Sequence, residues 1–224
     1  MIQTIEASPD EIYDIELEHS LLAANARLAS ENRALLDRHG IVAIDVMGAI
    51  GSGKTTLIGR IVERLKDRLG VAVLNGDATT STDADLIAGQ NVPVVQIATI
   101  NGCHLDANLV GKALRKINLA KLQMILIENI GNLICPAEFP LGSKARVVVV
   151  SVTEGQYMVR KHPHMFLGAD LVVVNKVDLA TVMEVSVDDL TADVHKLKPN
   201  LKVIPTSCKS GVGLEELTAS LLAV

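Results

Sequence analysis

The chain has 224 residues, enough for one α/β domain with an extension or for two small domains. Hydrophobic residues make up 49% of it and aromatic residues only 2%, so we expect a core of Val, Ile, Leu and Ala, as buried parallel strands prefer. The net charge of −5 argues against nucleic acid or an anionic membrane as a partner. Three cysteines, no long apolar run and no signal-peptide pattern favour a cytoplasmic location.

The first forty residues predict a helix. Ser8, Pro9 and Glu11 form a capping box with proline at the first helical position, and Gly40 is placed to end the helix. We therefore expect residues 1–40 to form a helical extension on a domain that spans residues 41–224. Packing against the flank of that domain is favoured over a role in recruiting partners.

Residues 48–55 read Gly-Ala-Ile-Gly-Ser-Gly-Lys-Thr, which is a complete phosphate-binding loop of the form G-x-x-x-x-G-K-[ST]. A β-rich run over residues 41–47 leads into it, and a helical pattern over residues 57–69 leads out, with Gly70 as its stop. This strand–loop–helix context predicts that the chain binds a nucleoside triphosphate.

The chemistry of this loop assigns a role to each kind of residue. Its glycines let backbone N–H groups turn toward an anion, and the helix N-terminus adds its positive dipole end. Lys54 can reach the β- and γ-phosphates, and the Thr55 hydroxyl can hold Mg²⁺. The loop residues expected to contact nucleotide are Gly48, Gly51, Ser52, Gly53, Lys54, Thr55 and Thr56.

A polar segment, residues 76–85, follows the next expected strand and has the composition of a switch loop. Asp77 in this segment is a candidate for binding Mg²⁺ or for orienting the attacking water. Asp83 and Asp85 are better explained as acidic residues at a helix N-terminus.

Strand patterns alternate with helical patterns along the rest of the chain. Such alternation predicts an α/β fold with a mostly parallel sheet, helices on both faces and ligands beyond the carboxyl ends of the strands. The expected strands cover residues 71–75, 92–97, 123–130, 146–152, 171–177 and 202–206. The expected helices cover residues 106–118, 158–167, 187–197 and 214–222.

The strand over residues 123–130 ends with an acidic residue and is followed by a glycine. Glu128 can hold Mg²⁺ through water, and Gly131 lets backbone N–H approach the γ-phosphate, so this segment could sense hydrolysis. The same fragment also fits a core strand that ends in a turn. Its position after the phosphate loop favours the functional interpretation, with Lys54, Asp77 and Glu128 as the residues expected to carry hydrolysis.

Residues 175–178 read Asn-Lys-Val-Asp, the N-K-x-D signature of guanine-binding strand ends. The Asp178 carboxylate can accept from two guanine donors, whereas adenine would leave it unpaired. Asn175 can tie the base edge to the phosphate loop, and the Lys176 stem can cover the ring. The next strand ends in Ser207, Cys208 and Lys209, where GTPases place a loop that meets the guanine carbonyl. GTP is therefore favoured over ATP.

Cys103 and His104 end one expected strand, and Cys135 follows another. In a parallel sheet both strand ends project to the same edge, so two thiolates and one imidazole could converge there. Such ligands suit Zn²⁺ or Ni²⁺. The spacing alone leaves open that these cysteines are small buried hydrophobic residues.

The sequence resembles the hydrogenase maturation (nickel-incorporation) GTPases, the HypB family. The matching segments extend from Asp45 to Leu214, and GCHL together with ENIGNLICPA is the most specific part. Urease accessory GTPases are related but carry a Cys-Pro-His triplet. The segments are GAIGSGKTTL, the NGD before the switch loop, GCHLDA, LIENIGNLICPAEFPLG, VSVTEG, ADLVVVNKVDL and SCKSGVGL.

The resemblance implies a P-loop NTPase fold of the SIMIBI-type GTPases and slow, Mg²⁺-dependent hydrolysis of GTP to GDP. It implies a role in inserting nickel into [NiFe]-hydrogenase, with a HypA-type nickel accessory protein and the hydrogenase large-subunit precursor as partners. Cys103, His104 and Cys135 would hold Ni²⁺ or Zn²⁺ near the interface of a GTP-dependent homodimer. Lys161 matches a family position that approaches nucleotide.

Two departures from the family pattern limit what the resemblance implies. The first forty residues contain no Cys and only His19 and His39, so we expect no separate N-terminal nickel site. Residues 156–160 are less charged than the family pattern.

Three other functions stay open. The first is a metal-binding scaffold whose dimerisation is set by GTP with incidental turnover. The second is a urease-type nickel accessory GTPase. The third, a small-molecule kinase, is disfavoured by the N-K-x-D strand end.

Overall fold

The computed structural model describes residues 2–6, 18–76, 87, 89–99 and 104–224. Within these residues, all strand pairs are parallel, and eight strands form one sheet in the order β1-β4-β3-β5-β2-β6-β7-β8. The strands are β1 (Ile2–Glu6), β2 (Val42–Gly48), β3 (Val71–Asn75), β4 (Val94–Ala98), β5 (Met124–Glu128), β6 (Ala145–Ser151), β7 (Leu171–Asn175) and β8 (Lys202–Pro205).

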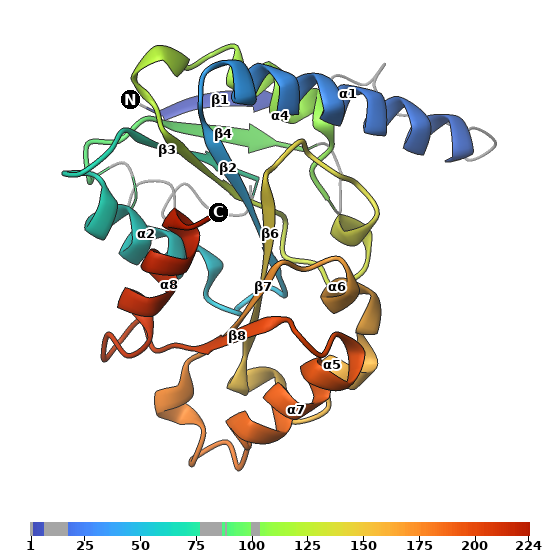
Figure 1. Cartoon of the computed structure of the whole chain (residues 1–224), viewed down its shortest axis with the longest axis vertical. Coiled ribbons are helices and arrows are strands. Elements are labelled where there is room, and N and C mark those ends of the chain that lie inside the picture. Colours follow the sequence, from blue (N-terminus) through green and yellow to red (C-terminus); the bar gives the residue numbers. More distant parts are fainter. Residues whose placement is uncertain (1, 7–17, 77–86, 88, 100–103) are drawn as a thin grey trace.

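Helices cover both faces of this sheet (Figure 1). Helices α2 and α8 lie on one face, and α1, α4, α5, α6 and α7 lie on the other. The helices are α1 (Glu18–Arg38), α2 (Lys54–Leu65), α4 (Ala107–Leu114), α5 (Met158–Lys161), α6 (Pro163–Leu167), α7 (Val187–Leu197) and α8 (Leu214–Leu222). Short 3₁₀ turns are η3 (Leu119–Lys121), η4 (Cys135–Ala137), η5 (Val152–Glu154) and η6 (Val177–Leu179).

The core is aliphatic, as the composition predicts. The central strands are buried on both faces because α2 and α8 pack against one side while α1 and α4, then α5 to α7, pack against the other. Burial on both faces explains why the strand sequences are continuous apolar runs rather than alternating patterns. Among the described residues, Phe166 is the one aromatic residue in the set of largest fully buried side chains.

The expected α/β fold with a parallel sheet is confirmed, and β3, α7 and α8 have the bounds that the patterns predict. Residues 2–6 differ from the expected helical extension because they form β1, which pairs with β4 at the edge of the sheet. The single helix expected over residues 158–167 is divided into α5 and α6 at His162, next to Pro163.

Helix α1 does lie within the predicted extension and ends at Arg38, two residues before Gly40, which has a φ of 65°. The capping box at Ser8 lies outside the described residues. Whether residues 1–40 are a separate extension stays a prediction. In the part of the chain that is described, no helix is both long and apolar enough to span a membrane.

Candidate nucleotide and metal site

The phosphate loop connects β2 to α2. It folds around the side chain of Lys54, the lysine of the loop motif. Gly51 and Gly53 have φ values of 78° and 94°, a left-handed backbone that glycine adopts without strain. The Lys54 side chain is buried, and its Nζ donates to the carbonyl oxygens of Gly48 at 3.2 Å and Ala49 at 3.0 Å. This conformation places the ammonium group within the loop that would surround the phosphates.

The acidic end of β5 lies directly against this loop. The Thr55 hydroxyl donates to Glu128 Oε1 at 2.6 Å, and Glu128 is fully buried. A Cβ atom on Gly131 would come within 2.5 Å of the Ile50 side chain, so only glycine allows the segment after β5 to approach so closely. Asn132 also forms an antiparallel bridge with Gly48. Thr55, Glu128 and Gly131 therefore lie together at the phosphate loop, and their roles toward Mg²⁺ and the γ-phosphate stay predictions.

The base-binding end of the site is formed by β7 and β8. Asn175 Nδ2 donates to the Ser52 carbonyl at 3.0 Å, as the tie between base edge and phosphate loop requires. Lys176 has a φ of 60°, and its Nζ donates to the Gly51 carbonyl at 2.6 Å. A side chain on Gly53 would collide with the Asn175 amide, at 2.5 Å from its Nδ2. The two predicted motifs thus meet in space.

The loop after β8 lies at the same end of the site and contacts the β7 loop. The Ser207 hydroxyl donates to Asp178 Oδ1 at 2.5 Å, and the Thr206 hydroxyl donates to Asn175 Oδ1 at 3.1 Å. Burial raises the pKa of the Cys208 thiol, which contacts the same Asn175 oxygen at 3.7 Å. Lys209 is exposed. The Ser207–Asp178 bond was not predicted, although both residues were.

Two of the three predicted metal ligands lie in the described residues. The His104 ring stacks on Phe139 with centroids 3.8 Å apart and planes 25° from parallel, and Cys135 is half-buried at the start of η4. Because Phe139 is four residues after Cys135, the two ligand-bearing segments lie side by side. Burial lowers the pKa of His104, which favours the neutral imidazole that binds metals.

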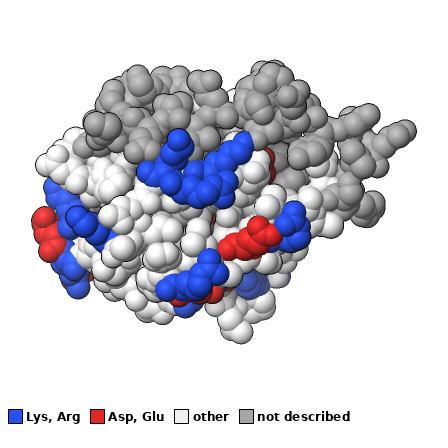
Figure 2. All heavy atoms as spheres, turned by 90° about the horizontal axis from the view of Figure 1, so that it is seen from above, with Lys and Arg blue, Asp and Glu red and all other residues white. Residues whose placement is uncertain are grey.

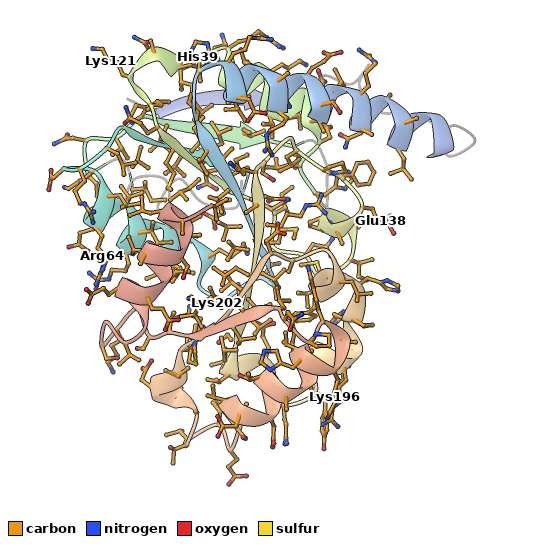
Figure 3. The ribbon with its side chains drawn as sticks, in the orientation of Figure 1. His39, Arg64, Lys121, Glu138, Lys196 and Lys202 are labelled. Atoms are coloured by element: carbon orange, nitrogen blue, oxygen red, sulfur yellow. The ribbon has the colours of Figure 1, made fainter. Side chains whose placement is uncertain are left out.

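Cys103 and Asp77, the other predicted ligands at this edge, lie outside the described residues. Within the described part, no three His, Cys, Asp or Glu side chains form a metal-binding group. Glu138, labelled in Figure 3, lies on the segment that follows Cys135, on the side of the molecule below α1. Burial has the larger effect and lowers the pKa of His104, whereas the Glu138 carboxylate acts in the opposite direction.

A buried polar group between the two sites was missed from the sequence. Asp45 on β2 is fully buried, and its Oδ1 accepts from Asn129 Nδ2 at 3.1 Å. The Asn129 Oδ1 atom accepts from the backbone N–H of Leu105 at 3.2 Å and of Ile130 at 3.0 Å. Burial raises the pKa of Asp45 to about 6, and the nearby Arg146 guanidinium limits the rise.

Arg146 extends this group to the second ligand-bearing segment. Its Nε lies 3.9 Å from Asp45 Oδ2, and its Nη1 donates to the Ala137 carbonyl at 3.0 Å. Polar residues inside otherwise apolar strands, such as Asp45 in the run over residues 41–47, were the available sequence signal.

Lys161 lies at the end of α5, beside the Cys135 segment. With Leu133, Ile134 and Glu138 it lines a cavity of about 520 Å³. Its predicted approach to nucleotide stays a prediction.

The chain is similar to proteins of known families. A model of the CobW/HypB/UreG nucleotide-binding domain matches residues 42–205. The chain belongs to this family. It is similar to the probable hydrogenase maturation factor HypB of Methanocaldococcus jannaschii, with 43% identity over 203 residues, 91% of this chain and 92% of that protein. The Escherichia coli K12 factor HypB is 40% identical, with 90% of this chain and 70% of that protein covered.

Solved structures of HypB proteins share the fold. HypB from Archaeoglobus fulgidus matches with a TM-score of 0.86 and 42% identity, covering 90% of this chain and 98% of that one. HypB from Helicobacter pylori in complex with nickel matches with a TM-score of 0.84 and 34% identity, covering 89% and 94%. The resemblance to the HypB family is thus confirmed, and the phosphate loop belongs to the nucleotide-binding domain that defines the CobW/HypB/UreG family.

Proposed function

We propose that this protein is a GTP-hydrolysing accessory protein that delivers nickel for the assembly of [NiFe]-hydrogenase. The observation that carries this proposal is the meeting of two sites at one edge of the sheet. The phosphate loop and the N-K-x-D strand end lie together there, and Glu128 leads along the chain to Cys135. The HypB names of the relatives and the nickel complex of the Helicobacter pylori structure support nickel as the cargo.

Guanine selectivity would come from the β7 and β8 loops. The Asp178 carboxylate would accept from the ring N–H and the amino group of guanine, and Ser207 holds this carboxylate in place. Asp178 is exposed in the absence of nucleotide. A bound base would cover its carboxylate, and adenine would then leave one acceptor unpaired, which costs about 1–3 kcal/mol.

Hydrolysis would be carried by residues at the phosphate loop. Lys54 would neutralise charge on the β- and γ-phosphates, with Thr55 and Glu128 holding Mg²⁺. Their oxygen atoms lie 2.6 Å apart, a hard-donor pair that fits this ion. Mg²⁺ held there would supply positive charge that stabilises the negative charge of the phosphates. Asp77 would orient the attacking water.

Nickel would be cargo at the neighbouring site. Cys103, His104 and Cys135 supply the soft nitrogen and sulfur ligands that suit Ni²⁺ or Zn²⁺. The proposed partners are a HypA-type accessory protein and the hydrogenase large-subunit precursor. The proposed assembly is a GTP-favoured homodimer, and the proposed location is the cytoplasm. Figure 2 shows basic and acidic side chains interspersed over much of the described part of one face, with one group of basic side chains near its centre.

The deciding experiment follows nickel and nucleotide together. The protein is loaded with Ni²⁺ and GTP, and transfer of nickel to a chelator is measured with GTP, with GDP and with a non-hydrolysable GTP analogue. We expect release with GTP and retention with the analogue. Release with the analogue would support the scaffold function, in which GTP binding alone sets metal state. Failure to bind Ni²⁺ in any nucleotide state would contradict the proposal.

A further inference from the structure

Helix α1 lies across the two segments that carry His104 and Cys135, outside the matched nucleotide-binding domain. It packs against α4, which starts three residues after His104. Two asparagines of α1 are buried, Asn25 at 6% and Asn32 at 7% exposure. A buried amide needs hydrogen-bond partners, so the question is where these two side chains find them.

Asn25 bonds to both segments at once. Its Oδ1 accepts from the backbone N–H of Ala107 at 2.8 Å, and its Nδ2 donates to the carbonyl of Pro140 at 2.9 Å. Ala107 is three residues after His104, and Pro140 follows Phe139, whose ring stacks on His104. The Asn25 amide therefore fixes the distance between these two segments close to the stacked rings of His104 and Phe139.

Asn32, two helical turns further along α1, repeats the arrangement. Its Nδ2 donates to the carbonyl of Ala107 at 2.7 Å and to that of Leu141 at 3.1 Å. Helix α1 packs closely against both α4 and the segment after η4. A Cβ atom on Gly142 would come within 2.5 Å of a backbone carbonyl oxygen of α1, and one on Gly111 within 2.8 Å of Asn32 Oδ1.

These bonds satisfy backbone groups at the first residue of α4 and in the segment after η4. Near His104, Leu105 is held by Asn129, and Ala107 is held by α1. After Cys135, Ala137 is held by Arg146, and residues 140–141 are held by α1. Helix α1 thus joins the outer ends of both segments, where the sheet does not reach.

We propose that α1 is a clasp whose two buried asparagines fix the distance between the His104 and Cys135 segments and thereby set the affinity of the metal site. This inference rests on the proposed function, because it takes these residues as metal ligands. Asn25 and Asn32 are positioning residues and touch no metal themselves. Partners that hold ligands in place typically change metal affinity 10–100-fold when they are removed.

The test measures Ni²⁺ affinity and the thiolate-to-nickel charge-transfer absorption for the full chain and for Asn25→Ala, Asn32→Ala and the double variant. We expect each single variant to weaken Ni²⁺ binding by roughly 10-fold and the double variant by up to about 100-fold. The absorption band should shift because the ligand geometry relaxes, whereas GDP affinity should stay within about 2-fold.

Three matched variants isolate the clasp from other effects. Arg27→Ala removes an exposed residue of α1 that pairs with Glu31 on the same helix, and it should leave Ni²⁺ affinity unchanged. Leu221→Ala destabilises the core on the opposite face of the sheet and should also leave it unchanged. Asn25→Asp keeps the acceptor for Ala107 and loses the donor to Pro140, so we expect an intermediate affinity.

The outcomes separate the clasp from the proposed function. If Cys135→Ala loses Ni²⁺ while both asparagine variants bind it as the parent does, the clasp is wrong and the metal site stands. If Cys135→Ala binds Ni²⁺ as the parent does, the metal site itself is wrong. If Leu221→Ala weakens Ni²⁺ as much as the asparagine variants, loss of stability explains the effect and the clasp is refuted.

Discussion

The nucleotide half of this sheet edge and the half that we propose to bind metal, which carries His104 and Cys135 and is called the metal half below, are built differently. In the nucleotide half, side chains join the ends of β7 and β2 directly, past the intervening β6, as Asn175 and Lys176 do when they bond to the phosphate loop. In the metal half, His104 and Cys135 lie on segments fixed from outside the sheet by Asn25 and Asn32, and from within it by Asn129 and Arg146. The first half is pre-organised by the sheet, whereas the second depends on bonds that another element supplies.

These two kinds of bonding predict which half of the sheet edge moves. Bonds between the ends of strands in one sheet cannot lengthen without disturbing the sheet, so the base site should change little between nucleotide states. A segment held by side-chain bonds can shift when one of its anchors shifts. Glu128 is bonded to Thr55 and precedes Asn129, so a change at the phosphates has a short route to Leu105 and His104.

The largest expected effect is on the nucleotide half alone. Lys54→Ala removes the loop ammonium, and we expect GTP affinity to fall by about 1,000-fold, or roughly 4 kcal/mol. Ni²⁺ affinity measured without nucleotide should stay as in the parent, because the described hydrogen bonds of the Lys54 ammonium go to its own loop. Calorimetry with GTP and with Ni²⁺ measures both, and Lys66→Ala, an exposed lysine after α2, is the control. Unchanged GTP affinity would contradict the phosphate-loop assignment.

The next effect tests base recognition. Asp178→Asn should weaken GTP by roughly 100-fold, about 3 kcal/mol, because an amide presents a donor to the guanine amino group. Xanthine nucleotide should then bind relatively better, since its keto group accepts from that donor. Ser207→Ala removes the hydroxyl that holds Asp178 and should cost less than about 10-fold. Competition binding with both nucleotides measures the ratio, and an unchanged ratio means that the N-K-x-D assignment is wrong.

The two halves also differ in how much the sequence predicted. The phosphate loop and N-K-x-D motif are contiguous, so local spacing carries their geometry, and the contacts between Asn175 and the loop were predicted. The clasp depends on Asn25 and Pro140, which are 115 residues apart. Such a pair leaves no local pattern, because in sequence Asn25 looks like any polar residue of an amphipathic helix.

Other features were missed for related physical reasons. Strand β1 is five residues long and is stabilised by pairing with β4, a tertiary contact that propensity cannot show. Asp45 was included in an apolar strand run, but its hydrogen bond comes from Asn129, 84 residues later, and its ion pair from Arg146, which is still further along the chain.

A third prediction concerns Asp45, which lies where the two halves meet. Its pKa is raised from 3.8 to about 6 in the folded protein. The folded state therefore binds more protons than the unfolded state between these values, and stability falls as pH rises from 4 to 6. Above pH 6 the full cost is present, up to about 3 kcal/mol.

Asp45→Asn keeps an oxygen that accepts from Asn129 and removes the buried charge. The free energy of unfolding of Asp45→Asn should therefore increase relative to that of the parent as pH rises from 4 to 7, by up to about 3 kcal/mol. Urea unfolding of both proteins at pH 4, 5, 6 and 7 measures this difference. Asp37→Asn, an exposed change on α1, should show no such trend. A constant difference across the series would mean that Asp45 is not the group that titrates near pH 6.

The smallest expected effect joins the halves. By thermodynamic linkage, if GTP shifts the segment from Glu128 to Cys135, nucleotide state must change metal affinity, and metal must change GTP affinity by the same factor. A coupling of about 1–3 kcal/mol is typical of such systems. Two sets of titrations complete this thermodynamic cycle. Ni²⁺ is titrated into the protein with GDP and with a non-hydrolysable GTP analogue, and each nucleotide is titrated with and without Ni²⁺.

The same cycle in two variants shows which connection carries the coupling. Cys135→Ala should lose most Ni²⁺ binding and keep GDP affinity, because the base contacts lie on β7 and β8. Asn25→Ala should bind Ni²⁺ more weakly in both nucleotide states but keep the coupling, since the Glu128–Asn129–Leu105 connection is intact. Equal Ni²⁺ affinity with GDP and with the analogue in the parent would mean that the two halves share an edge of the sheet but act independently.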